Sequence, residues 1–394
     1  MNPSSKYWIN NFFSDVKNKI EKYKNVSNND LYQIFAQTGI LYGIPVKSIT
    51  YDKKKYFEWN NIEMLKIIYI ETIVLITVNK LKTNDIPAII NNIYNFIKKQ
   101  KKTTDNNIEN KLAVIENYIN KLFTQKTIKS KILYHDSYNF IFIDFYLYFK
   151  FIDNDFINID LQKKEIICET LILINNFINI DNKIVDYEKN IYNYYIESAK
   201  NYIIDFDINK CNKTTTINYN IYDNIFVKKV IIDIAIIIFL EDNNIDDQEK
   251  KELTKLIHNF ELNDNYLQQS IIFVENFIVE NSGKILFLNK KKLPYITKSL
   301  TERILKLIRK NKNMIISEIR ESGELLALIR KSLTTELTKD EKQKVNKQIK
   351  DIIKSIPALA IFMIPGGSIL LPLILKILPD DLVYPSSFKN EKKL

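Results

Sequence analysis

Apolar residues recur at helical spacing through much of the chain, and the clearest case lies near its end. A stripe of apolar residues at intervals of three and four predicts an amphipathic helix over residues 339–356. The stripe consists of Val345, Ile349, Ile352, Ile353 and Ile356. The remaining surface of this helix is rich in lysine: Lys342, Lys344, Lys347, Lys350 and Lys354. Thr338 and Glu341 have the spacing of a capping box, which fixes where the helix begins.

A hydrophobic segment, residues 356–378, follows this helix. Its first twenty residues, Ile356–Leu375, carry no formal charge, and twenty helical residues span about 30 Å, the thickness of a bilayer core. We therefore predict a hydrophobic helix, broken by proline and glycine, that meets lipid. Lys376 follows it and can reach the membrane interface. The residues that bend the segment or change its polarity are Pro357, Pro365, Gly366, Gly367, Ser368 and Pro372.

The rest of the chain predicts further helices. Residues 62–81 are almost continuously apolar, but the longest stretch without charge is too short to span a membrane, so we expect a buried core helix. Residues 85–98 and 107–123 predict amphipathic helices, and Ser27 with Asp30 marks a helix start. The chain has only six glycines in 394 residues, and because tight hairpin turns favour glycine, we expect few of them. The prediction is an all-α fold of multi-helical bundles.

Two central segments resemble each other. Each has an apolar helix, an acidic turn and a second helix that opens with Lys-Lys-Glu, so we predict a duplicated helical hairpin. Asp144 and Asp233 lie within the apolar helices, where an unpaired carboxylate is costly, and Lys229 is one turn from Asp233. The matching positions are Asp144 with Asp233, Asp153 with Asp242, and Lys163-Lys164-Glu165 with Lys250-Lys251-Glu252.

The second copy, Phe239–Ile257, resembles the tellurite-resistance TerB-like fold, which implies an all-helical domain with metal affinity in its acidic turn. The candidate ligands are Asp242, Asn244 and Asp246. The glycine and the final glutamate of a calcium loop are missing, so capping of the next helix by Asp246 and Glu249 explains the turn better. We expect no metal and no cofactor.

The composition limits the class of protein. The net charge of +10 suits anionic lipid, nucleic acid or the ribosome, but most of the excess is scattered lysine, and we expect no DNA partner. Cys168 and Cys211 do not make a disulfide scaffold and fit a reducing cytosol. The N-terminus lacks the apolar core of a signal peptide. The chain also lacks nucleotide-binding glycine motifs and histidine metal spacing, so we do not expect an enzyme.

Residues Leu337–Phe388 resemble the membrane segment of the leucine-zipper, EF-hand-containing transmembrane family, the Letm family. The shared features are the Leu-Thr opening, the prolines at matching spacing and the closing Pro385-Ser386-Ser387-Phe388. The order of TerB-like helices and then this module resembles bacterial Letm-related proteins described as biofilm-associated. We therefore divide the chain into an N-terminal helical region (1–105), a TerB-like region (106–300) and a Letm-like module (301–394).

The resemblance implies cation/proton exchange, volume control and ribosome binding. An ion carrier needs an ionisable group at membrane depth, and this chain has Ser368 where the family has a glutamate. The ribosome-binding region of the family normally follows this module, whereas this chain ends at Leu394. Both departures favour a role other than antiport or ribosome binding.

The sequence thus predicts a non-enzymatic, membrane-associated helical protein on the cytoplasmic side of a bacterial inner membrane. Its role would be a scaffold or regulator of ion and envelope homeostasis, with membrane lipid as a partner and with a second copy or another protein as further partners. Two alternatives stay open. One is a cation/proton transport subunit. The other is a soluble interaction or ribosome-associated protein whose apolar segment folds back at Pro365-Gly366-Gly367 as a core hairpin.

Overall fold

The structure is a computed structural model, and all regular secondary structure in the residues that it describes is helical, which confirms the all-α fold. It describes residues 1–52, 58–101, 111–123, 138–155, 158–180, 186–203, 206–211, 217–240, 245–285, 290–354 and 370–379. The α-helices are α1 (Trp8–Val16), α2 (Asn28–Thr38), α4 (Asn61–Leu81), α5 (Ile86–Lys101), α6 (Lys111–Leu122), α7 (Phe142–Ile152), α8 (Ile159–Ile178), α9 (Asp186–Tyr202), α10 (Ile225–Phe239), α11 (Asp247–Asn259), α12 (Asp264–Asn281), α13 (Leu293–Lys310), α14 (Lys312–Glu321), α15 (Gly323–Thr334), α16 (Lys339–Lys354) and α17 (Leu370–Leu375). The short 3₁₀ helices are η1 (Glu21–Tyr23), η2 (Ile40–Tyr42), η4 (Ile208–Lys210), η5 (Tyr219–Ile221) and η7 (Lys290–Lys292).

The chain forms two compact units. The N-terminal unit comprises Met1–Phe239, Asp246–Glu261 and Gly283–Phe287. The C-terminal unit comprises Leu240–Ile245, Leu262–Ser282 and Leu288–Leu394. The boundaries at residues 105 and 300 that the sequence suggested stay predictions.

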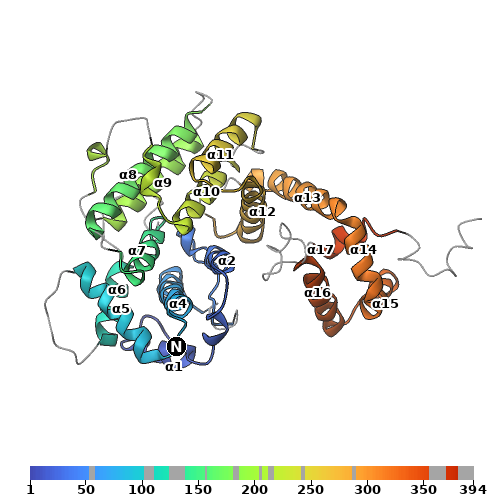
Figure 1. The fold of residues 1–394 in the computed structure, drawn as a ribbon, viewed down its shortest axis with the longest axis horizontal. Coiled ribbons are helices and arrows are strands. Elements are labelled where there is room, and N and C mark those ends of the chain that lie inside the picture. Colours follow the sequence, from blue (N-terminus) through green and yellow to red (C-terminus); the bar gives the residue numbers. More distant parts are fainter. Residues whose placement is uncertain are drawn as a thin grey trace, which may run out of the picture. The chain divides into compact units, whose positions relative to one another are not determined.

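Helix α4 is the central element of the N-terminal unit. Asn60 and Glu63 form a complete capping box at its start, which explains why the helix begins at Asn61. Nearly every side chain from Met64 to Asn79 is buried, as a helix that is apolar on all sides requires. It packs against α5 and α7 and against η1 and η2 (Figure 1). The buried core helix predicted for residues 62–81 is therefore confirmed.

The two similar segments each contain a pair of packed helices. The first copy contains α7 and α8, and the second contains α10 and α11. Helix α10 also packs against α7 and α8, so the copies share one core. The origin of this arrangement by duplication stays a prediction.

Asp144 in α7 is fully buried and is surrounded by hydrogen-bond donors. One of its oxygens accepts from the hydroxyls of Tyr69 and Tyr118, both at 3.1 Å. The other accepts from the Tyr202 hydroxyl at 2.5 Å and lies 2.9 Å from Lys163 Nζ. Burial, followed by the charge of Asp144, raises the pKa of Tyr202 well above its usual value, so this tyrosine stays a donor. Four donors compensate the desolvation of one carboxylate.

Asp233 in α10 has a related environment. Its Oδ2 atom accepts from the hydroxyls of Tyr32 and Tyr42, both at 2.6 Å. Lys229, one turn earlier, donates to Asn29 Oδ1 at 2.6 Å. Tyrosine hydroxyls from distant parts of the chain thus donate to both buried aspartates, in addition to the Lys163 ammonium at Asp144, and the sequence analysis had not suggested these tyrosines.

Glu71, in the middle of α4, anchors the segment that follows η2. Its carboxylate accepts from the hydroxyls of Ser48 and Thr50, both at 2.6 Å. It also accepts from the backbone N–H groups of Ile49 and Thr50, both at 2.9 Å. These bonds fix an irregular segment against a helix whose buried side chains are mostly apolar.

Replacing Glu71 with alanine should lower the free energy of unfolding by about 2–4 kcal/mol, because four donors lose their acceptor. Burial raises the pKa of Glu71, and its hydrogen bonds act in the opposite direction. The wild type therefore loses stability as the pH rises from the ordinary glutamate pKa through the raised one. The difference between the two proteins should be larger at about pH 4 than at about pH 8.

Urea titrations at both pH values check this expectation. The exposed Glu165→Ala change in α8 serves as the control and should alter stability by less than about 0.5 kcal/mol. If the difference in free energy of unfolding between the wild type and Glu71→Ala is instead larger at about pH 8 than at about pH 4, the folded protein favours the charged form of Glu71.

Candidate functional site

The candidate site is the end of the C-terminal unit, and α16 is its best-defined element. The Thr338 N–H donates to Glu341 Oε2 at 2.9 Å, and the Glu341 N–H donates to Thr338 Oγ1 at 3.3 Å. The predicted capping box is present, and α16 runs from Lys339 to Lys354, within the predicted helix 339–356.

The apolar stripe of α16 is buried in the protein. The helix packs against α14 and α15, which form a small helical cluster with it. The stripe residues Val345, Ile349, Ile352 and Ile353 are each less than 9% exposed, and Ile356 lies outside the described residues. An apolar face that is already covered cannot also insert into lipid. Only the basic face of α16 can therefore meet an external surface.

Ion pairs neutralise part of this basic face. Lys344 Nζ lies 2.9 Å from Glu324 Oε1, and Lys331 Nζ lies 2.6 Å from Glu341 Oε1. Lys342 and Lys347 are exposed, and Lys350 is half-buried. Within the part of the chain that the structure describes, these three lysines make no ion pair. The helix extends to Lys354, whose side chain lies outside the described residues.

The positive charge of the chain is concentrated in this region. Residues 290–354 contain 18 lysines and arginines against eight acidic residues, a net charge of +10 that equals the net charge of the whole chain. All four arginines lie here: Arg303, Arg309, Arg320 and Arg330. This clustering of positive charge can be read from the sequence, but the sequence analysis described the excess lysines as scattered. Arg303 Nε lies 3.2 Å from buried Glu275 Oε1, which joins α13 to α12.

The hydrophobic segment is described in part. Pro357, Pro365, Gly366, Gly367 and Ser368 lie outside the described residues. Residues Leu370–Leu375 form the six-residue helix α17, which packs against α13. Its first turn contains Pro372, where a helix tolerates proline, and both Pro372 and Lys376 are exposed. The apolar side chains on the other face are buried: Leu370, Leu373, Ile374, Ile377 and Leu378.

No described helix has the length and apolar character that a membrane crossing requires. The described part of the segment lies against α13, where its leucines find an apolar environment within the protein. The described residues 370–375 therefore give no support to a transmembrane helix, and the choice between a membrane segment and a core hairpin stays open for the rest of the segment, which lies outside the described residues.

The acidic turn gives a capped helix. Asp246 accepts from the Glu249 N–H, and Glu249 accepts from the Asp246 N–H, both at 2.8 Å. This capping box starts α11. It is the cap that the sequence analysis offered as the alternative to a metal site. Asp242 and Asn244 lie outside the described residues, among which no group of three metal-ligating side chains occurs.

The two cysteines are joined. Cys168 in α8 and Cys211 after η4 form a disulfide across a separation of 43 residues. This differs from the expectation that the cysteines stay reduced, and neither the spacing nor the local pattern had suggested the pairing.

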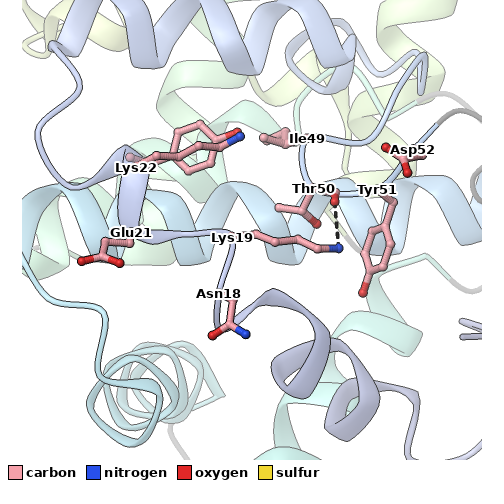
Figure 2. A pocket seen from close by; sticks show the side chains of 9 residues that line it. Asn18, Lys19, Glu21, Lys22, Ile49, Thr50, Tyr51 and Asp52 are labelled. Atoms are coloured by element: carbon pink, nitrogen blue, oxygen red, sulfur yellow. Dashed lines mark hydrogen bonds between the residues drawn. The ribbon is translucent and has the colours of Figure 1, made fainter.

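A polar cavity of about 580 Å³ lies in the N-terminal unit between residues 18–23 and 49–52. Figure 2 shows the Lys19 side chain extending to the Tyr51 ring, whose centroid lies 4.5 Å from Lys19 Nζ, and Lys19 Nζ donates to Thr50 O at 3.0 Å. The walls carry both signs of charge, from Lys19 and Lys22 and from Glu21 and Asp52. Mixed charges on an open wall select neither an anion nor a cation.

The comparison with family models concerns the C-terminal segment. Residues 337–394 match the family model described as LETM1-like, RBD. This segment is LETM1-like. The match supports the resemblance to LETM1-like proteins and contains α16 and α17; the matched model is described as RBD, whereas the sequence resemblance had been to the membrane segment of that family. No curated protein and no solved structure matches the chain. A LETM1-like segment fits a membrane-associated role in ion homeostasis in general.

Substitutions at Asp246 separate a cap from a metal ligand. Asp246→Ala should lower the free energy of unfolding by about 1 kcal/mol because the N3 amide of α11 loses its acceptor. Asp246→Asn keeps an oxygen acceptor and should change stability by less than about 0.5 kcal/mol. Addition of Ca²⁺ should leave the melting temperature of the wild type unchanged. A calcium-dependent rise that both substitutions abolish would establish a metal site instead.

Proposed function

We propose that this protein is a non-enzymatic helical scaffold or regulator of ion and envelope homeostasis that binds an anionic membrane surface peripherally. Its position would be the cytoplasmic side of the inner membrane. The basic face of α16 would meet the lipid headgroups. The observation that carries the proposal is the placement of the whole net charge of +10 in residues 290–354, beside the LETM1-like segment.

The charge distribution supports attraction to lipid in preference to insertion. A lysine near an anionic leaflet contributes about 1 kcal/mol, and Lys342, Lys347 and Lys350 lie on one helix without carboxylate partners among the described residues. The apolar stripe of α16 is occupied by α14 and α15, so the helix keeps its fold when it meets a membrane. Tyr295 at the start of α13 is 54% exposed, and tyrosine is a residue type that favours the headgroup region.

A second candidate follows from α17. The burial of Leu370 and Ile374 against α13 supports a soluble interaction protein whose apolar segment belongs to its own core. A biofilm-related role stays a prediction that rests on the resemblance alone.

Flotation of the full chain with lipid vesicles tests the peripheral role. Changing Lys342, Lys347 and Lys350 to glutamine should weaken binding to phosphatidylglycerol-containing vesicles by about 100-fold, since each lysine contributes about 1 kcal/mol. The control changes Lys164, Lys250 and Lys251, three exposed lysines of the N-terminal unit, to glutamine. This control alters the net charge equally and should retain most of the binding.

Added salt should weaken the binding of the wild type, because exposed charges are screened. If both triple variants lose vesicle binding equally, the binding depends on net charge alone, and this result would contradict a specific role for the basic face of α16. Binding to pure phosphatidylcholine as tight as to anionic vesicles would also contradict the proposal. Retention of the protein in cell membranes after carbonate washing would show insertion, whereas a fully soluble protein in gentle lysates would favour the second candidate.

A further inference from the structure

A second cavity lies in the N-terminal unit. It has a volume of about 350 Å³, and it lies where α2, α7 and α10 meet the end of α4. Aromatic and aliphatic side chains form most of its wall: Leu31, Tyr32, Phe35, Phe149 and Phe226. All five are less than 9% exposed, whereas Ile225 at the same cavity is 44% exposed and marks its opening toward solvent.

The aromatic wall is rigid. The rings of Tyr32 and Phe226 pack edge-on at 5.9 Å, and the ring of Phe149 lies 5.3 Å from that of Phe226. Tyr32 is also fixed from behind, because its hydroxyl donates to buried Asp233. A wall that is held in this way requires little reordering when a ligand enters.

Two ammonium groups line the same cavity. Lys229 is 8% exposed and lies 5.4 Å above the Tyr32 ring, where its hydrogen bond goes to the neutral amide oxygen of Asn29. Lys80 lies 5.7 Å above the Phe149 ring and pairs with Asp153 at 2.7 Å. Burial lowers the pKa of Lys229, with Asp233 and Asp30 acting in the opposite direction, so a further anion would stabilise its charged form.

Side-chain amides add donors. The amide oxygen of Asn224 accepts from the Phe226 N–H at 2.8 Å, and that of Asn29 accepts from Lys229. Their NH₂ groups make no hydrogen bond within the described residues. The cavity thus offers ammonium and amide donors beside an apolar wall.

We propose that this cavity binds a small organic monocarboxylate with an apolar aryl or branched alkyl body. The carboxylate would lie at Lys229 and Lys80, and the body would contact Tyr32, Phe149 and Phe226. The volume is at the lower end of the range of ligand pockets, about 300–1,000 Å³, which limits the ligand to a small molecule. Two ammonium groups disfavour a cation, and the buried aromatic wall disfavours a hydrated inorganic anion.

Calorimetric titration of the full chain with three ligands that share one body tests this assignment. Phenylacetate carries a carboxylate, phenylacetamide is neutral and phenethylamine is cationic. Phenylacetate should bind at least about tenfold more tightly than the amide, because a charged acceptor strengthens hydrogen bonds to ammonium groups. The amine should show no saturable heat.

Lysine variants locate the binding site. Lys229→Met and Lys80→Met should each weaken phenylacetate binding by about tenfold and leave phenylacetamide binding within about twofold. Lys251→Met, an exposed lysine of α11, is the control and should leave both ligands unaffected. Circular dichroism checks that each variant is folded. Lys80→Met should disturb the core less than Lys229→Met, because the Lys80 side chain is 29% exposed.

Three results would overturn the proposal. The first is equal affinity for the acid and the amide. The second is phenylacetate binding that neither lysine variant weakens. The third is the absence of saturable heat with millimolar phenylacetate and with 4-methylpentanoate, a branched alkyl acid. These outcomes do not depend on vesicle binding by the C-terminal unit.

Discussion

The N-terminal unit depends on one constraint, that a carboxylate inside an apolar core must be surrounded by donors. Asp144, Asp233 and Glu71 are at most 1% exposed. Hydroxyl and backbone N–H groups donate many of the hydrogen bonds that these carboxylates accept, and the Lys163 ammonium also lies 2.9 Å from Asp144. A carboxylate that accepts from several segments fixes the relative positions of those segments, because each donor has one favourable direction. This is how helices with uniformly apolar surfaces can pack in one arrangement.

The helices of the C-terminal unit are packed in a different way from those of the N-terminal unit. The C-terminal helices have narrow apolar stripes and charged outer faces, and the buried stripe of α16 illustrates this pattern. Some of the outer charge is locally balanced, as at Lys344 and Glu324, and the remainder is positive. Unbalanced positive charge on a folded surface attracts anionic partners over a long range and raises their rate of association. It contributes little to the stability of the fold.

Local patterns in the sequence predicted the parts of the fold that local physics determines. The caps at Ser27, Asp246 and Thr338 depend on residues three positions apart, and all three are present. Helix α4 was predictable because residues 62–81 are almost continuously apolar, while their longest stretch without charge is too short to span a membrane. The tyrosine partner of Asp233 was not predictable, since Tyr32 is 201 residues away in sequence and any of 23 tyrosines could have served. The environment of residues 370–378 was not predictable from the sequence, because hydrophobicity alone does not distinguish a lipid environment from the face of α13.

The disulfide between Cys168 and Cys211 closes a ring of chain that includes α9. That ring contains Tyr202, which donates to Asp144, so the covalent link and the polar core hold the same helix from two sides. Closing a ring of this size removes conformational freedom from the unfolded chain and contributes about 4 kcal/mol in the chain-entropy account. The stability of the α9 position therefore depends partly on the oxidation state of the surroundings, because a thiol reductant would remove one of the two links that hold this helix.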